Sequence, residues 1–452
     1  MKRALIAAVI LWTWNASSSP DLVVRAETSL RRALDAIASK QVNGGWGMAW
    51  TQDRRYMWGE YRMIPHGWIT VQPPATPSVA SVFLHAARVL DDPAYAQHAR
   101  TARDALLAIQ TADGGFPYEA DPKGRRPMRA TFDDDTTTGA LRFLIDFWQF
   151  TKDEADLRAV RSVGDFLLKA QYADTGGWPQ EYPPMAMTYG RHITFNDNAM
   201  VNVIRALLTL HTLTGDRRYL EAAIKGGDCI IRLQGGPGEE IWAAQYDPVA
   251  LRPAWARKFE PPSYSSAESV GVCNMLIDLY LGTGLERFLE PLPKALAWYD
   301  AHRLPNGKWA RFYEVGTQRP VYGRKDKAEP VYDVSQAKSG YSWQGTWYPE
   351  HAKRAYERIK AVGRDAYAQE RRAAEAPPKA AGLEPEVEEV CASLTPAGWW
   401  LAPPDDDQRA EMKEKGIEED EPIITTEAFC KSAGLLLTYI ERVRGPTTVG
   451  RL

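Results

Sequence analysis

The chain repeats one pattern along most of its length: an apolar stretch with helical spacing, a turn that contains glycine, and then a large aromatic residue. Successive aromatic residues mostly lie about 60 to 70 residues apart. That length holds two helices and their connections, so each repeat predicts one helical hairpin. The turns with their aromatic residues lie at 44–46, 114–116, 176–178, 238–242, 307–309 and 398–399.

Between these turns the apolar residues keep the period of an amphipathic helix, as Leu141, Leu144 and Ile145 do. Glycine suits a helix end in the left-handed conformation, and the aromatic residue after it can fill the gap between hairpins. We therefore interpret the tryptophans as packing residues rather than as residues that stack on sugars. Hairpins of this kind form an open solenoid or a ring, and about six units favour closure. The predicted fold is all-α, an (α/α) toroid of helical hairpins with long loops.

One large domain is expected over residues 26–452. The chain has 452 residues, 44% hydrophobic and 25% charged, as globular proteins do. Residues at about 366–388 are rich in Ala, Pro and Glu and are interpreted as an insertion before the last hairpin. The formal net charge of -3 argues against nucleic acid as a partner, because such binding needs a basic face.

The first residues have the order of a secretory signal peptide. Basic residues come first, an apolar run follows from Ala4 to Trp12, and small residues occupy 16–19. We assign residues 1–25 to a signal peptide and leader, which predicts a secreted or periplasmic protein. The apolar run is roughly half of the ~20 residues that span a bilayer, so stable membrane insertion is not expected.

A first acidic cluster lies just before the helix that is expected to begin near Thr137. It contains Asp133, Asp134 and Asp135 in succession. Adjacent carboxylates repel one another, and a bound cation would relieve that repulsion. The alternative is helix capping, since Asp satisfies free amides at a helix start. One cap explains one of these residues and leaves two.

A second cluster, Asn196, Asp197 and Asn198, lies at the start of the next predicted hairpin. A single Asp-Asn pair before a helix is usually a cap, but its recurrence at the same place in the next hairpin would place both helix starts on one rim. Oxygen donors without paired histidines favour calcium or magnesium over zinc. The four cysteines show no Cys-x-x-Cys spacing, so neither a zinc site nor a redox motif is indicated.

A basic region follows, in which arginines alternate with aromatic residues. Guanidinium groups pair with carboxylates and aromatic rings cover sugar faces, so this region suits a polyanionic sugar chain. Glu268 fits a capping box with Ser265 and is interpreted as structural, as is His192. The basic residues are Arg252, Arg257, Lys258, Arg311, Arg319, Arg324 and Lys325.

Several of these segments, in this order, resemble polysaccharide lyase family 10, the pectate lyases. The resemblance runs from about Gly44 to the final helix, expected from about Thr426 to Val443, apart from the 366–388 insertion. Beside the Asp133 segment, the matching motifs lie at 72–78, 192–200, 242–247, 256–263 and 309–314.

The resemblance implies a calcium-dependent β-elimination on polygalacturonate. We expect the protein to be a monomer. It implies that Asp133 and Asp197 bind Ca2+ and that Asp134, where the family often has Asn, contacts substrate. It also implies that Arg257 is the catalytic base. Because the free pKa of arginine is about 12 or higher, nearby cations and calcium would have to hold Arg257 partly neutral, and we expect an alkaline optimum. Uronate carboxylates would be held by Arg311, Arg319 and Arg324.

Three alternatives remain from the residues alone. An inverting hydrolase on the same toroid would use Asp133 and Asp197 as acid and base. A terpenoid-cyclase-like toroid is suggested by Gln110 before Gly114 and Gln171 before Gly176, which resemble the Gln-Trp repeats of that class. A sugar-binding module without catalysis would bind pectin and leave it intact.

Overall fold

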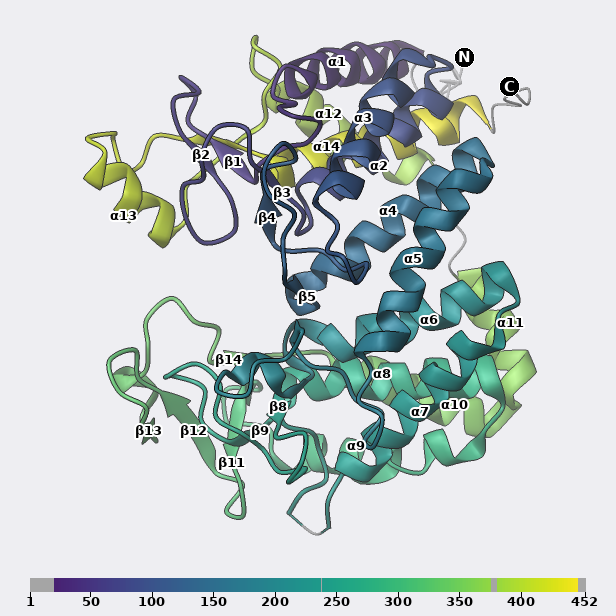
Figure 1. Ribbon diagram of the computed structural model, residues 1–452, viewed down its shortest axis with the longest axis vertical. Helices are drawn as coiled ribbons and strands as arrows, with labels where there is room; N and C mark the ends of the chain where they lie inside the picture. Colours follow the sequence, from purple (N-terminus) through teal and green to yellow (C-terminus); the bar gives the residue numbers. More distant parts are fainter. Residues whose placement is uncertain (1–19, 237, 375–379, 446–452) are drawn as a thin grey trace, which may run out of the picture.

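The protein, seen in a computed structural model that describes residues 20–236, 238–374 and 380–445, is built from helices that pack as hairpins (Figure 1). For most neighbouring hairpins, the first helix of one packs against the first helix of the next. These inner helices are α2 (Thr76–Val89), α4 (Thr136–Thr151), α6 (Ala199–Thr214), α8 (Ser266–Thr283), α10 (Pro349–Val362) and α14 (Thr426–Arg444). Their hairpin partners are α3 (Ala94–Ile109), α5 (Glu154–Ala170), α7 (Arg217–Leu233), α9 (Leu292–Ala301), α11 (Arg364–Ala374) and α1 (Pro20–Ala38).

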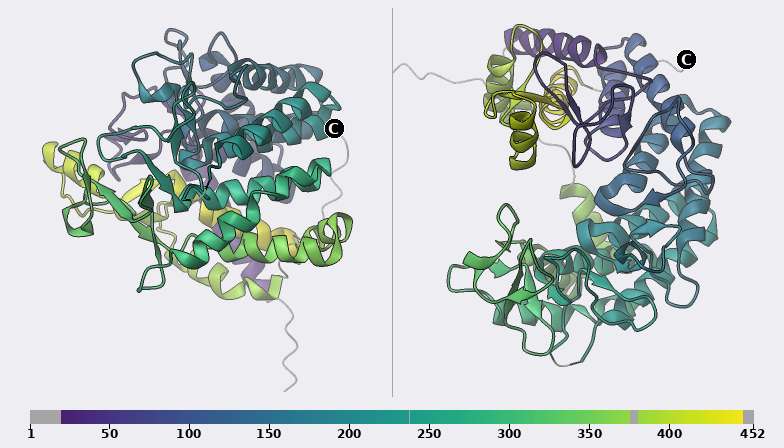
Figure 2. Two further views of the ribbon diagram at one scale, coloured as in Figure 1. Left: turned by 90° about the horizontal axis from the view of Figure 1, so that it is seen from below. Right: turned by 60° about the vertical axis from the view of Figure 1, so that its left-hand side comes forward.

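The C-terminal helix α14 packs against α1 and α2, and so brings the C-terminal part of the chain next to the N-terminal part. The hairpins then follow one another around an arc that is open on one side in the right-hand view of Figure 2. This arrangement confirms the predicted all-α, (α/α) toroid-like fold. It also shows that the last hairpin is assembled from both ends of the chain.

The repeated tryptophan is a packing device, as expected. Trp178 is buried, and its indole N–H donates to the carbonyl of Leu167 at 2.8 Å, near the end of α5. A buried indole needs such a partner, and the bond fixes the ring between consecutive hairpins. The same bond joins Trp46 to Ile37, Trp242 to Ile230 and Trp309 to Tyr299. At the last turn it is made by Trp400, to Val390, and not by the predicted Trp399.

Glycine and glutamine in the same turns fasten each hairpin to the next. Gly176 has φ +79°, and a Cβ there would lie 2.6 Å from the carbonyl oxygen of Lys225 in α7. Only glycine allows this close approach. The Gln171 side chain donates to the carbonyls of Gly176 and Ala222, both within 2.9 Å. The glutamines that resemble Gln-Trp repeats are therefore explained by packing between hairpins.

Short strands lie in the loops at one end of the helices (Figure 1). One strand precedes each inner helix, so the six helix starts share this rim: β3 (Ile69–Thr70), β5 (Ala130–Thr131), β7 (Ile193–Thr194), β9 (Ser263–Ser265), β14 (Gln344–Gly345) and β16 (Ile423–Thr425). The first three pair with β4 (Glu119–Ala120), β6 (Glu181–Tyr182) and β8 (Gln245–Tyr246), and β14 pairs with β10 (Trp309–Ala310). Two four-stranded sheets complete the rim. The first has the strand order β15 (Leu401–Ala402), β16, β1 (Ala49–Trp50) and β2 (Met57–Trp58). The second has the order β13 (Pro330–Val331), β12 (Pro320–Gly323), β11 (Phe312–Glu314) and β9.

The ends of the domain differ from the expected boundaries. Residues 20–25, which we assigned to the leader, form the first turns of α1, with Leu22 and Val23 buried. The expected signal sequence at 1–19 lies outside the described residues. The segment at 366–388 is helical where it is described, in α11, η6 (Ala380–Gly382) and α12 (Glu384–Ser393), and α12 packs against α1 and α14.

Among the described residues, no helix combines the length and hydrophobicity that crossing a membrane requires. The four cysteines are free, with Cys229 and Cys273 buried in the helices. Burial raises the pKa of Cys229 to about 12, so this thiol stays protonated at neutral pH.

Candidate active site

The two acidic segments form nearly identical turns at the starts of α4 and α6. Asp134 has φ 47° and ψ 35°, and Asp197 has φ 49° and ψ 30°. The residue after each is also left-handed, Asp135 at φ 59° and Asn198 at φ 59°. Asp and Asn tolerate this conformation better than most residues. The structure thus makes Asp134 equivalent to Asp197, and Asp133 equivalent to Asn196.

Helix capping does not explain these residues. Neither the Asp135 nor the Asn198 side chain accepts a hydrogen bond from a backbone N–H in the first turn of its helix. Asp135 instead pairs with Arg142 and accepts a hydrogen bond from Thr138 at 2.5 Å. It is directed away from the cluster by these partners, which leaves its two neighbouring carboxylates for another role.

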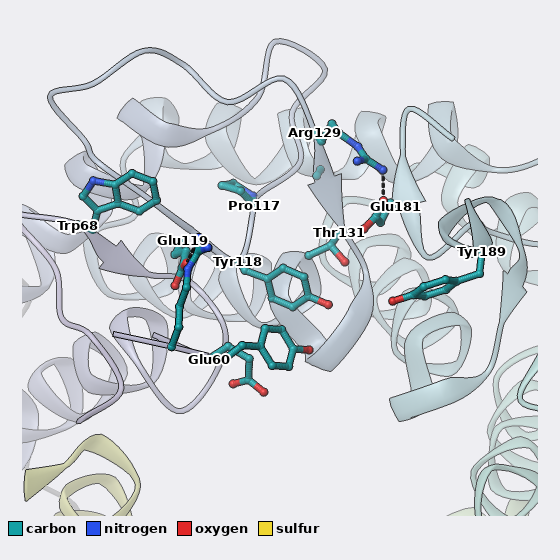
Figure 3. A pocket seen from close by; sticks show the side chains of 12 residues that line it. Glu60, Trp68, Pro117, Tyr118, Glu119, Arg129, Thr131, Glu181 and Tyr189 are labelled. Carbon is teal, nitrogen blue, oxygen red and sulfur yellow. Dashed lines mark hydrogen bonds and ion pairs between the residues drawn. The ribbon is translucent and has the colours of Figure 1, made fainter. Parts of the chain in front are cut away.

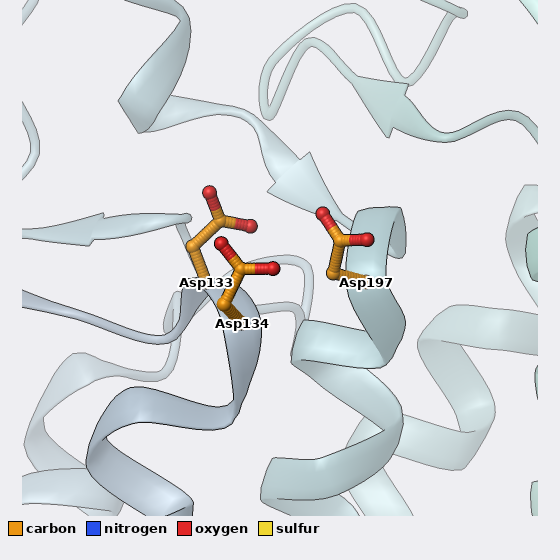
Figure 4. Close-up of side chains that lie close together, drawn as sticks. All are labelled: Asp133, Asp134 and Asp197. Carbon is orange, nitrogen blue, oxygen red and sulfur yellow. The ribbon is translucent and has the colours of Figure 1, made fainter. Parts of the chain in front are cut away.

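Asp133, Asp134 and Asp197 form one carboxylate cluster, called here the acidic triad. Each offers an oxygen within 4.8 Å of the others, and Figure 4 shows the three groups facing one another across the two helix starts. Burial, with the charge of the other triad members, raises the pKa of Asp134 to about 7 and that of Asp197 to about 7. Burial also raises the pKa of Asp133, against hydrogen bonds from Tyr118 and Gln180.

Two buried oxygens beside the triad have no hydrogen-bond partner. They are Oδ1 of Asp133 and Oδ1 of Asn196, at equivalent places in the two turns, and both side chains are at least nine-tenths buried. Buried acceptors are normally satisfied. A hard divalent cation would satisfy such oxygens and would neutralise the triad, and oxygen donors of this type suit calcium. The residues present therefore fit a calcium site.

Two partly buried arginines face the triad. Arg311 is only 14% exposed, and the electrostatic attraction between it and Asp197 counters the raised pKa of that carboxyl. Arg257 acts in the same direction on Asp133 and Asp134. Of the residues predicted from the sequence, the structure thus brings together Asp133, Asp134, Asp197, Arg257 and Arg311.

Each of these arginines is held by a buried glutamate. Arg257 donates to both carboxylate oxygens of Glu260, at 2.5 and 2.8 Å. Arg311 donates to Glu268 at 2.5 Å. Although burial lowers the pKa of Arg257, the contacts with Glu260 outweigh it and raise that pKa above its ordinary value. The contacts with Glu260 thus favour the charged form of Arg257, and the expectation that nearby cations and calcium hold it partly neutral stays a prediction.

The other two predicted arginines have partners elsewhere. Arg319 pairs with Glu314 at 3.0 Å, and its guanidinium lies 3.6 Å from the centroid of the Tyr332 ring. Arg324 pairs with Asp326 at 2.7 Å. Both lie in or next to the sheet of β11 and β12, and both are more than a third exposed. Their assignment to substrate carboxylates stays a prediction.

Glu268 was wrongly interpreted as a capping residue. The Ser265 side chain makes no capping bond, and its hydroxyl donates to the Glu268 carboxylate instead. Glu268 thus belongs to the site through Arg311. Sequence reasoning also missed Glu260, although its position three residues after Arg257 offered a signal, and it missed Tyr118, whose hydroxyl donates to Asp133 at 2.7 Å.

A pocket of about 460 Å³ adjoins the triad (Figure 3). Its wall includes β5, which leads directly into Asp133, and residues 60–62 from the loop after β2. Tyr61 donates to Asp134 at 3.3 Å, so the pocket and the triad share a border. This volume is within the range of about 300 to 1,000 Å³ that is usual for small-molecule sites.

Solved structures resemble the chain as follows. A mutant of a family 10 polysaccharide lyase from Cellvibrio cellulosa, in complex with trigalacturonic acid, has 25% identity and a TM-score of 0.50, over 64% of this chain and 98% of that one. Another structure of the family 10 lyase from Cellvibrio cellulosa has 26% identity and a TM-score of 0.49, over 58% of this chain and 91% of that one. An α-mannanase from Bacteroides thetaiotaomicron covers 94% of this chain at 10% identity, with a TM-score of 0.48. No curated protein gives a significant match.

The helical toroid, with carboxylates and arginines together on its rim, defines the class of the protein as a polysaccharide lyase. A family within this class can also be assigned. The pectic acid lyase family matches residues 118–308 and 305–351, just over half of the chain, and the chain belongs to that family.

Proposed function

We propose that the protein is a calcium-dependent pectate lyase that cleaves α-1,4-linked polygalacturonate by β-elimination. The observation that carries this proposal is the acidic triad facing two partly buried arginines on the rim, in a chain of the pectic acid lyase family. A uronate polymer needs cationic groups for its carboxylates, and the elimination needs stabilisation of the charge that develops beside C6. The complex of the Cellvibrio lyase with trigalacturonic acid supports the substrate class.

The calcium ion would be held by Asp133, Asp134 and Asp197, with Asn196 beside them. The equivalence of Asp134 and Asp197 favours Asp134 as a ligand in addition to its predicted contact with substrate. When bound, calcium would neutralise the triad and a substrate carboxylate, and so acidify the proton at C5. Competition between protons and calcium would weaken binding at low pH, because the ligands must be ionised.

The chain's own residues would carry the elimination as follows. Arg311 binds the C6 carboxylate and stabilises the enolate-like charge on it. Arg257, in its neutral form, takes the proton from C5. The electron pair then forms the double bond between C4 and C5, and the bond from C4 to the glycosidic oxygen breaks. That oxygen leaves with the other fragment and takes up a proton from solvent. Since Glu260 favours the charged form of Arg257, this step needs alkaline pH.

The hydrolase alternative fits the geometry less well. An inverting glycosidase separates its two carboxyl groups by roughly 6.5 to 9.5 Å to admit a water molecule. Here oxygens of Asp133 and Asp197 lie within 4.8 Å of each other. The cyclase alternative loses its support, because Gln171 and Trp178 serve the packing of hairpins.

A polygalacturonate assay separates the remaining functions. A lyase produces both reducing ends and the ultraviolet absorbance of a conjugated double bond, a hydrolase produces reducing ends alone, and a binding module produces neither. We expect EGTA to abolish the absorbance and added calcium to restore it. Arg257→Ala should remove activity by at least about a hundredfold while the circular dichroism spectrum is unchanged, with Arg252→Ala as control.

Activity that persists in EGTA would refute the calcium requirement, and normal turnover by Arg257→Ala would remove that residue from the mechanism. The residues that resemble a signal peptide support export to the periplasm or the medium. N-terminal sequencing of the exported protein tests this, and light scattering tests the expected monomer.

A further inference from the structure

The start of α10 repeats the left-handed pair of residues that forms the two acidic turns. Trp347 has φ 49° and Tyr348 has φ 58°, where Asp134 has 47° and Asp135 has 59°. The residues before α2, α8 and α14 all have negative φ. Since α10 is an inner helix like α4 and α6, Trp347 takes the place on the rim that Asp134 and Asp197 take in their own turns.

A bulky aromatic residue is poorly suited to this conformation. Glycine adopts it freely and Asp and Asn tolerate it, whereas a large side chain there is an outlier. Two such residues in succession persist only where the surrounding structure holds them, and strain of this kind gathers at functional sites. The backbone at Trp347 therefore indicates that the position of its ring is constrained.

Trp347 differs from the tryptophans that pack the hairpins. Each of those donates its indole N–H to a backbone carbonyl, as Trp178 does. The N–H of Trp347 is buried, and no hydrogen-bond acceptor reaches it among residues 20–236, 238–374 and 380–445. Its ring lies against Gly345 in β14, where an added Cβ would come within 2.6 Å of it. The ring is thus held against the strand by van der Waals contact rather than by a hydrogen bond.

The charged neighbour of this ring is Arg311. The guanidinium carbon Cζ lies 5.7 Å from the centroid of the Trp347 ring and 5.2 Å from that of Tyr341. Both distances fall within the ~6 Å over which a cation is attracted to an aromatic face. Arg311 also donates to Glu268 at 2.5 Å, so it is held by the starts of α8 and α10 while it faces Asp197 at the start of α6.

The hydrogen bonding of Arg311 leaves its guanidinium free to turn. Arg257 donates through Nε and Nη2 to the two carboxylate oxygens of Glu260, which fixes the plane of its guanidinium. Arg311 donates to Glu268 through Nη2 alone, and its Nε is buried without an acceptor in the part of the chain that the structure describes. A single hydrogen bond does not fix a plane, and the two aromatic rings supply the missing constraint, because guanidinium groups stack on aromatic faces.

We propose that Trp347 is a positioning residue for Arg311, and that its ring holds the guanidinium in the orientation that receives a uronate carboxylate beside the triad. The inference rests on the proposed function, because it takes the C6 carboxylate as the ligand of Arg311. Tyr341 is the second ring, but its hydroxyl donates to Glu260 at 3.2 Å, so replacing it would disturb Arg257 as well. The Trp347 side chain has no hydrogen bond among the described residues, so its replacement isolates the effect on Arg311.

The first test replaces the ring in the full-length protein, with polygalacturonate and saturating calcium. Trp347→Leu should lower kcat by about tenfold or more, because a misplaced guanidinium loses its contact with the developing charge, and should change KM less than about twofold. Trp347→Phe should keep kcat within about threefold of wild type, because it retains an aromatic face and lacks only an N–H that has no acceptor among the described residues. Tyr348→Leu is the matched control: it is the neighbouring left-handed aromatic residue, is 62% exposed, stacks on His351, and should leave both values unchanged.

A second variant moves the ring without changing any charged or aromatic residue. Gly345→Ala places a methyl group against Trp347, and Gly345 has no left-handed φ, so the variant adds steric pressure alone. It should lower kcat by about threefold or more in the wild-type background, and by little further when combined with Trp347→Leu. Full activity of Gly345→Ala, or equal losses in both backgrounds, would overturn the proposal.

The coupling to Arg311 decides whether the ring acts through that residue. In an Arg311→Gln background, Trp347→Leu should cost less than it does in wild type, both in kcat and in the midpoint of unfolding in urea, because the partner of the ring is gone. Equal costs in both backgrounds would refute positioning. So would a rise in KM with unchanged kcat, which indicates direct contact with the sugar, or a Trp347→Phe variant as slow as Trp347→Leu. The urea comparison needs no substrate, so a protein that cleaves no polygalacturonate would refute the proposed function and still test the contact.

Discussion

Replacing Asp134 by Asn should stabilise the calcium-free protein at alkaline pH. The three triad carboxylates lie within 4.8 Å of one another, and at an effective dielectric constant of about 20 one such pair repels by about 3.5 kcal/mol. Asn keeps the size of the side chain, tolerates the left-handed backbone and can still accept from Tyr61. The substitution therefore removes charge and little else.

The pKa of Asp134 gives a second route to the magnitude. Folding raises it from 3.8 to about 7. A folded pKa above the unfolded value means that stability is complete below pH 3.8 and is lost as pH rises to about 7. At 1.36 kcal/mol per pH unit the loss is about 4 kcal/mol, an upper bound because the site can relax. We expect Asp134→Asn to raise the free energy of unfolding by about 2 to 4 kcal/mol at pH 8 and by almost nothing at pH 4.

The assay is urea denaturation in EGTA at several pH values, followed by fluorescence. The matched control is Asp135→Asn, the adjacent left-handed residue, which pairs with Arg142 and should lose up to about 1 kcal/mol. With calcium present, the advantage of Asp134→Asn should vanish or reverse, because a proposed ligand is gone. A variant with wild-type stability in EGTA at pH 8 would refute the repulsion on which the metal site is argued.

Two further predictions concern the proposed catalytic base Arg257 and the packing between hairpins. Glu260→Gln should move the alkaline rise of lyase activity to lower pH by about 1 unit, because Arg257 loses the charge that raises its pKa; an unchanged pH profile contradicts this. Gly176→Ala should cost about 2 kcal/mol or more, because its Cβ would lie 2.6 Å from the carbonyl oxygen of Lys225. Gly215→Ala, at φ +71° with no atom within 4 Å of the new Cβ, should cost about 1 kcal/mol, and equal midpoints in urea would remove the role of close packing.

Local sequence was sufficient for the repeating unit. Gly176 and Trp178 contact only their own turn and its neighbouring helices, so their spacing in the sequence predicts the hairpin and its packing residue. Contacts of this kind recur with the chain's own period, which is why the helical toroid could be predicted. The acidic segments were visible for the same reason, since Asp134 and Asp197 occupy the same place in consecutive units.

Side-chain contacts between residues of different hairpins could be identified only from the tertiary structure. Glu268 meets Arg311 from a position 43 residues away, and Asp133 meets Gln180 from 47 residues away. Such contacts depend on how far each hairpin rotates relative to the last, and side-chain periodicity does not encode that angle. For this reason the sequence alone led to the interpretation of Glu268 as a capping residue.

What the sequence alone determined was the hairpin repeat, the acidic helix starts and the family resemblance, because each is written in residues close together in the chain. What only the tertiary structure decided was which charges meet. Arg257 is paired with Glu260 and Arg311 with Glu268, whereas three aspartates at the triad have no cation among the described side chains directly hydrogen-bonded to them. The physical reason is that electrostatic energy depends on distance and burial, and the winding of the hairpins into an arc sets both.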